Sequence, residues 1–122
     1  MIGYVTLGTN DMARAATFYD ALLAELGAKR GMESDKFISW SAGPTSPGIG
    51  IIKPADGKAA TIGNGSMVAI HCDSPAKVKS LYDKAIALGG KDEGPPGIRF
   101  GTFYAAYFRD LDGNKLNAFC MS

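Results

Sequence analysis

The sequence lacks the features of an extracellular, membrane or nucleic-acid-binding protein. Its two cysteines, Cys72 and Cys120, are too few for a disulfide framework and suit a reducing cytoplasm, where we expect them to be small buried side chains. No apolar run approaches the roughly 18 residues of a membrane span, and the N-terminal residues do not resemble a signal peptide. The 13 basic residues balance 12 acidic ones and form no basic run. We therefore expect a cytoplasmic protein that binds neither membrane nor nucleic acid.

What the sequence does have is an internal repeat. Tyr19-Asp20 recurs as Tyr82-Asp83, at an offset of 63 residues, and Leu26-Gly27 returns as Leu88-Gly89. A repeat of this length is one supersecondary module that cannot bury its apolar face alone. We therefore expect a single domain of 122 residues that contains two related modules.

Both copies predict the same order of elements, β-α-β-β-β. Apolar residues at helical spacing predict one helix from about Met12 to Gly27 and another from about Pro75 to Gly89. The predicted strands lie at 2–9, 28–33, 36–42 and 48–53 in the first copy, and at 66–72, 90–94, 102–109 and 115–121 in the second. The fold class is α+β, with two tandem βαβββ modules whose strands form a curved mixed sheet around a concave cavity and whose helices lie outside. Module 1 covers about 1–53 and module 2 about 66–122, joined by a Gly-, Ala- and Pro-rich linker at about 54–65.

Turn and cap residues mark the boundaries of these elements. Asn10 or Asp11 can cap the first helix, and Asp73 or Ser74 the second. The segment 110–114, Asp-Leu-Asp-Gly-Asn, predicts a tight hairpin because these residues tolerate left-handed backbone conformations. The segment 94–97, Gly-Pro-Pro-Gly, predicts an exposed loop with few backbone donors.

Two of these segments carry a resemblance to a known family. Asn10-Asp11-Met12 leading to Phe18-Tyr19, together with the segment 108–114 (Phe-Arg-Asp-Leu-Asp-Gly-Asn), resembles the vicinal oxygen chelate superfamily. This group contains glyoxalase I, bleomycin-resistance proteins and extradiol dioxygenases, and the resemblance covers nearly the whole chain. In catalytic members each module supplies metal ligands, usually His, Glu or Gln, from its first and last strands. The bound divalent ion then chelates vicinal oxygens of the substrate.

The resemblance places the metal-ligand positions on residues that are poor metal ligands. By similarity three of the positions fall at Tyr4, Met67 and Asn117, and the fourth lies within 50–52, where no ligand-type side chain exists. A neutral phenol, a thioether and an amide bind divalent transition metals weakly and bring no negative charge. We therefore expect no metal and no other cofactor.

His71 is the only histidine, and three interpretations of it remain open. It can be a structural or capping residue near Asp73, a polar group of the cavity, or a metal ligand. A single imidazole cannot hold a metal without partners, and the sequence pattern places no carboxylate on the same face.

The function implied is binding of a small molecule. We expect the cavity to be lined by Tyr4, Trp40, Met67, His71, Tyr107, Asn117 and Phe119. Lys53 can meet an anionic group at the rim, although ordinary sheet packing is an alternative for Lys53 and for the cavity aromatics on strands. A mostly apolar pocket with a few polar groups is typical of such sites.

Two other classes of function remain open. One is a divergent metal-dependent enzyme, either a glyoxalase-like lyase of the lactoylglutathione lyase type or a dioxygenase-like enzyme, with metal ligands recruited from elsewhere. The other is metal-free acid–base catalysis by Tyr4 or His71. No catalytic residue can be assigned, and the resemblance alone implies a homodimer.

Overall fold

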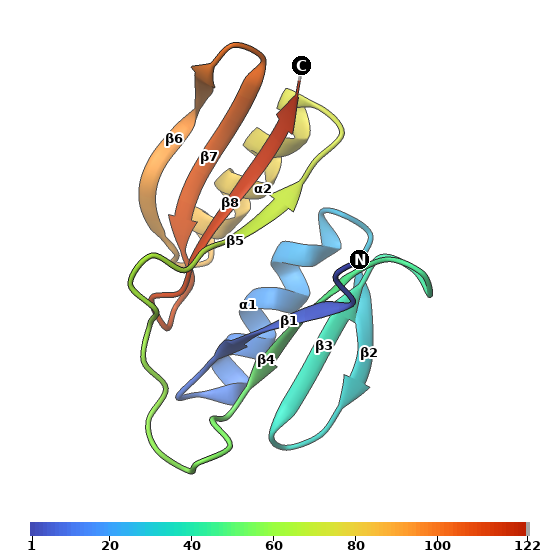
Figure 1. The fold of residues 1–122 in the computed structure, drawn as a ribbon, viewed down its shortest axis with the longest axis vertical. Coiled ribbons are helices and arrows are strands. Elements are labelled where there is room, and N and C mark those ends of the chain that lie inside the picture. Colours follow the sequence, from blue (N-terminus) through green and yellow to red (C-terminus); the bar gives the residue numbers. More distant parts are fainter. Residues whose placement is uncertain (122) are drawn as a thin grey trace. The chain divides into compact units, whose positions relative to one another are not determined.

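The computed structural model describes residues 1–121, and contacts within the chain divide it into two units, Met1–Ile62 and Gly63–Ser122 (Figure 1). The first unit contains β1 (Tyr4–Gly8), α1 (Met12–Ala24), β2 (Lys29–Glu33), β3 (Phe37–Ser41) and β4 (Gly48–Ile52). The second contains β5 (Val68–His71), α2 (Pro75–Ala87), β6 (Lys91–Phe100), β7 (Phe103–Arg109) and β8 (Lys115–Met121). The predicted β-α-β-β-β order is confirmed in both copies.

Each unit forms one open, mixed four-stranded sheet. The strand order is β1-β4-β3-β2 in the first sheet and β5-β8-β7-β6 in the second. The first strand of each unit pairs in parallel with the last, and the remaining pairs are antiparallel. The predicted α+β class is therefore confirmed, and neither sheet closes into a barrel.

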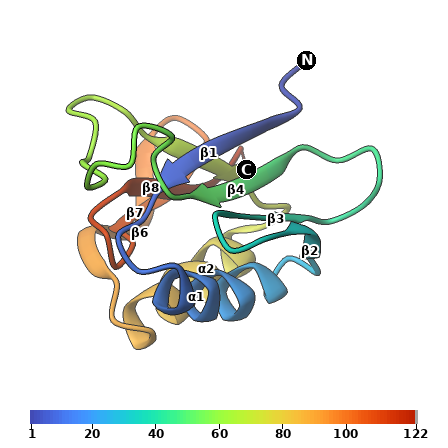
Figure 2. The ribbon, with the colours of Figure 1, turned by 90° about the horizontal axis from the view of Figure 1, so that it is seen from below.

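In each unit the helix lies along one face of its own sheet (Figure 2). In the first unit Phe18 and Leu22 of α1 are buried together with Ile38 and Ile51 of the sheet. In the second unit α2 packs chiefly on β6, β7 and β8. Its buried residues are Val78, Leu81 and Ala85, and the buried residues of β7 and β8 include Ala106, Phe108, Leu116, Ala118 and Cys120. The opposite face of each sheet carries no helix.

The predicted caps, turn and buried cysteines are confirmed. Asp11 caps α1 by accepting from the backbone N–H of Arg14, and Ser74 caps α2 by accepting from Lys77. In the 110–114 turn the Asp110 carboxylate accepts from three N–H groups. Both cysteines are free and buried, and burial raises the pKa of the Cys72 thiol to about 11. No helix in the described part of the chain is long and apolar enough to cross a membrane.

The prediction of an exposed loop at 94–97 is wrong. These residues lie inside β6, which continues from Lys91 to Phe100. β6 is an edge strand with β7 as its only neighbour, so the two prolines, which lack an N–H donor, do not interrupt a central ladder. Register shifts on both sides of Gly94 absorb the irregular backbone, as β-bulges do.

Asp20 links α1 to the buried Trp40. Its carboxylate accepts from the Trp40 indole N–H at 2.9 Å and from two nitrogens of the Arg30 guanidinium at 2.9 and 2.7 Å. Trp40 is 2% exposed and its ring packs 5.7 Å from that of Tyr19. The hydrogen bond from Arg30 lowers the pKa of Asp20 more than partial burial raises it.

We predict that Asp20→Ala lowers the free energy of unfolding by about 2 kcal/mol, because it leaves the buried indole N–H without an acceptor. Asp20→Asn keeps an acceptor for Trp40 and loses only the ion pair with Arg30, so its loss should be smaller. Since the pKa of Asp20 is lowered on folding, the ionic part of its contribution is complete above the ordinary value of 3.8 and is lost as the pH falls through the lowered value. Urea unfolding at pH 7 and pH 3 measures both effects. Equal losses for the two variants at pH 7 would contradict the role given to the indole bond.

Candidate functional site

The helix-free face of the second sheet gathers most of the predicted site residues. Along β8, Leu116, Ala118 and Cys120 are buried, as expected beneath α2, so alternation places Lys115, Asn117, Phe119 and Met121 on the opposite face. The register between strands extends this face to β5 and β7. We call it the open face; it is formed by Ala69, His71, Phe103, Ala105, Tyr107, Lys115, Asn117, Phe119 and Met121.

A row of four rings crosses all four strands of this sheet. The His71 ring of β5 meets Phe119 of β8 edge-on, with ring centroids 5.4 Å apart. Phe119 stacks on Phe103 of β7 at 5.6 Å, and Phe103 stacks on Phe100 of β6 at 5.1 Å with the two planes 12° apart. Phe100 is 69% exposed. The row therefore ends in an exposed ring, and it offers an apolar surface to another planar group.

Asn117 lies next to this row and has an unsatisfied polar atom. The residue is 1% exposed, and its side-chain oxygen has no hydrogen-bond partner within residues 1–121. Its neighbours across the sheet are Ala69 on β5 and Tyr107 on β7. A buried acceptor without a partner costs about 1–3 kcal/mol, so a group that donates to it from outside the chain would recover that cost.

The Tyr107 end of the open face is positively charged. The Arg99 guanidinium carbon lies 5.3 Å from the centroid of the Tyr107 ring, and the Lys115 ammonium lies 5.5 Å from it. Arg109, on the same strand as Tyr107, forms an ion pair with Glu93 at 3.5 Å. The open face is therefore aromatic near Phe119 and cationic near Tyr107.

The helix-free face of the first sheet is also aromatic. Tyr4 is 62% exposed and its ring meets that of Phe37 edge-on, with centroids 6.1 Å apart. Phe37 covers Gly50 so closely that a Cβ atom at position 50 would lie 2.5 Å from the ring. The Phe37 ring therefore occupies the space in which a metal-ligating side chain at position 50 would stand.

The residues at the predicted metal-ligand positions do not fit a divalent metal ion. Tyr4, Met67 and Asn117 offer a phenol, a thioether and an amide, and Gly50 offers no donor. Within residues 1–121 no three His, Cys, Asp or Glu side chains are grouped closely enough to hold a metal. The donor set of the described residues therefore supports no metal-dependent step.

The structure distributes the seven predicted cavity residues unevenly. Tyr4 and Trp40 belong to the first unit, and Met67, His71, Tyr107, Asn117 and Phe119 belong to the second. His71 and Phe119 are brought into ring contact, and Tyr107 faces Asn117 across the strands. Met67 precedes β5 and is 41% exposed.

Trp40 departs from the expectation. It is buried among core residues and bonded to Asp20 of α1, because its position in β3 alternates with Ser39 and Ser41 and points towards the helix.

Sequence reasoning missed Phe37, Phe100 and Phe103. Phe37 and Phe103 lie second in the strands predicted at 36–42 and 102–109, but whether rings on neighbouring strands stack depends on register, which the sequence does not reveal.

Comparisons with known proteins agree on the fold and its family. The family model described as Glyoxalase/Bleomycin resistance protein/Dioxygenase superfamily matches residues 1–118. A search of curated proteins found no match.

Three solved structures illustrate the range of similarity. A glyoxalase/bleomycin resistance protein from Albidiferax ferrireducens T118 is 37% identical, with a TM-score of 0.91, over 100% of this chain and 99% of that one. The hypothetical protein SA1046 from S. aureus is 25% identical, with a TM-score of 0.77, over 98% and 92%. A lactoylglutathione lyase from Agrobacterium tumefaciens is 18% identical, with a TM-score of 0.74, over 98% and 92%, and at that identity only the fold is shared.

Proposed function

The chain belongs to the glyoxalase/bleomycin resistance protein/dioxygenase superfamily, and on that premise we propose that it binds a small molecule without using a metal ion. The ligand is planar and largely apolar, and it carries an N–H or O–H group. The observation that carries the proposal is the juxtaposition, on one face, of a ring row and the buried, unpartnered oxygen of Asn117.

The row of rings and the Asn117 oxygen contribute differently to ligand binding. A ring that packs on the exposed Phe100, or against the edges of Phe103 and Phe119, gains about 0.5–1.5 kcal/mol for each aromatic contact in addition to burying apolar area. This packing is tolerant of ring type and so gives affinity without much selectivity. The Asn117 oxygen supplies selectivity, because a ligand that lacks a donor leaves that buried acceptor unsatisfied.

The donor chemistry supports binding without a metal. A divalent ion bound by a phenol, a thioether or an amide would lose its hydration shell without gaining a charged ligand. The divergent metal-dependent enzyme is the alternative, and no group of side chains within residues 1–121 favours it.

A matched pair of probes tests the proposal. Indole and 1-methylindole present almost the same ring, but only indole can donate an N–H bond. In amide NMR titrations with EDTA present, we expect indole to shift signals from β5, β7 and β8 and to bind at least about tenfold more tightly than 1-methylindole, as expected for a lost bond to a buried group.

Three results would reject the proposal. The first is equal binding of the two indoles, and the second is signal shifts confined to other parts of the chain. The third is stoichiometric binding of Ni²⁺ or Zn²⁺ in calorimetry, which would favour the metal-dependent alternative.

The homodimer expected from the resemblance is part of the same proposal. Light scattering coupled to size exclusion tests it directly, and a mass of one chain at working concentrations would reject it.

A further inference from the structure

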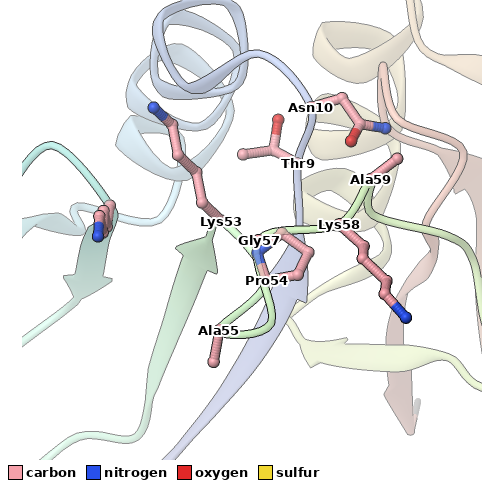
Figure 3. Close-up of a pocket in the computed structure, with 9 residues that line it drawn as sticks. Thr9, Asn10, Lys53, Pro54, Ala55, Gly57, Lys58 and Ala59 are labelled. Carbon is pink, nitrogen blue, oxygen red and sulfur yellow. The ribbon is translucent and has the colours of Figure 1, made fainter.

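A hollow of about 380 Å³ lies in the first unit, where β4 leaves the sheet and the chain turns back towards the start of α1 (Figure 3). The residues around it are Thr9, Asn10, Lys36, Lys53, Pro54, Ala55, Gly57, Lys58 and Ala59. Three of these nine are lysines, and none is acidic. Every charged residue around the hollow is therefore a lysine.

The loop that forms this hollow is held in place by specific contacts. Asn10 binds Ala60 twice, accepting from its backbone N–H at 2.7 Å and donating to its carbonyl at 3.1 Å. The backbone N–H of Lys53 donates to the carbonyl of Lys36, and Gly57, with φ of +75°, closes a turn onto Pro54. These bonds fix the backbone positions from which the three lysines project.

The ammonium groups of the three lysines have no carboxylate oxygen within 4 Å among the described residues. Arg30, Lys79 and Arg109 each form an ion pair, whereas no ion pair is found for Lys36, Lys53 or Lys58 within residues 1–121. The nearest carboxylate along the loop, that of Asp56, accepts from the backbone N–H of Lys58. Asp56 does not line the hollow.

The lysine side chains stand apart around the hollow. In Figure 3 Lys53 extends towards α1, while Lys58 points away on the other side of the loop. Like charges repel, and flexible lysine stems without ion-pair partners are able to turn. An anion placed between them would draw the ammonium groups inward and relieve that repulsion.

We propose that this hollow is a binding site for a small, multiply charged oxyanion, such as a phosphoryl group. Lysine binds such groups as a point charge, and the strength of binding grows with the charge of the anion. The proposal is independent of the ligand on the open face.

Pyrophosphate is the probe, and backbone amide NMR locates where it binds. We expect saturable shifts at residues 53–60 and at Asn10, weaker binding of inorganic phosphate, and loss of affinity as KCl is raised. Lys53→Gln and Lys58→Gln should each weaken pyrophosphate binding by at least about fivefold. Lys29→Gln removes the same charge from β2 of the same unit and should change the affinity less than about twofold.

Three outcomes would overturn the proposal. The first is the absence of saturable binding, and the second is shifts centred outside the hollow. The third is an equal loss of affinity in Lys29→Gln, which would show that the net charge of the protein, and not the position of the lysines, determines the binding of pyrophosphate. Thermal unfolding of each variant confirms that a loss of binding does not come from a loss of structure.

Discussion

Asn117→Leu is expected to stabilise the ligand-free protein while abolishing its preference for indole over 1-methylindole. Leucine has a similar branched shape and carries no acceptor, so the cost of the buried, unpartnered oxygen disappears. The gain in free energy of unfolding should be about 1 kcal/mol, and the tenfold discrimination between the two probes should fall to about one. Urea unfolding and NMR titration measure the two effects on the same variant.

Asn114→Leu is the matched control. Asn114 is also buried, but its side-chain amide donates to the Asp110 carboxylate at 2.9 Å. Removing this satisfied group should destabilise the protein by about 1–3 kcal/mol and leave the discrimination between the indoles intact. If both variants lose stability, the Asn117 oxygen has a partner in solution, and its role as an acceptor for the ligand fails.

Gly90→Ala is expected to produce the largest loss of stability from a single added methyl group. Gly90 lies between α2 and β6, and a Cβ atom there would lie 2.7 Å from the carbonyl oxygen of Ala85 and 2.8 Å from that of Arg109. Both atoms belong to the backbone, so neither can rotate aside. We expect a loss of about 3 kcal/mol, seen as a lower midpoint in chemical unfolding.

Gly97→Ala provides the comparison for Gly90→Ala. At position 97 the added methyl group meets only the end of the Arg99 side chain, at 3.3 Å, and that flexible side chain is able to move. Its effect should stay below about 1 kcal/mol. Similar losses of stability for the two variants would show that the two carbonyl contacts at position 90 do not determine the cost.

The repeat and the spacing of apolar residues were sufficient to predict the element order. Helix α1 follows a stripe that includes Phe18 and Leu22, and Gly27 ends that segment with a φ of +73°. These signals depend only on residues close together in the sequence, so tertiary packing does not change the elements that they predict. The error at 94–97 has a tertiary cause. Gly-Pro-Pro-Gly is typical of a loop, but the segment can also lie in an edge strand, where the lack of proline N–H groups does not interrupt a central ladder.

Residue type and strand alternation were sufficient to predict only part of the candidate site, namely which residues of one strand share a face of the sheet. Alternation predicts that His71 and Ala69 share a face, and the register between β5 and β8 adds Asn117 and Phe119 to it. Trp40 instead lies on the face that α1 covers, and its hydrogen bond to Asp20 joins residues 20 positions apart, which sequence spacing does not reveal. The stacking of Phe103 between Phe119 and Phe100 likewise depends on register and bulges across three strands.

The strand order of the second sheet constrains how that unit is assembled during translation. β5 has a single neighbour, β8, and Val68 pairs with Leu116. After β5 leaves the ribosome it therefore has no ladder partner until α2, β6, β7 and β8 have all been synthesised. Closing so distant a pair is slow, so the second unit is expected to complete its folding only after β8 emerges, with the apolar side chain of Ile70 exposed to chaperones in the interval.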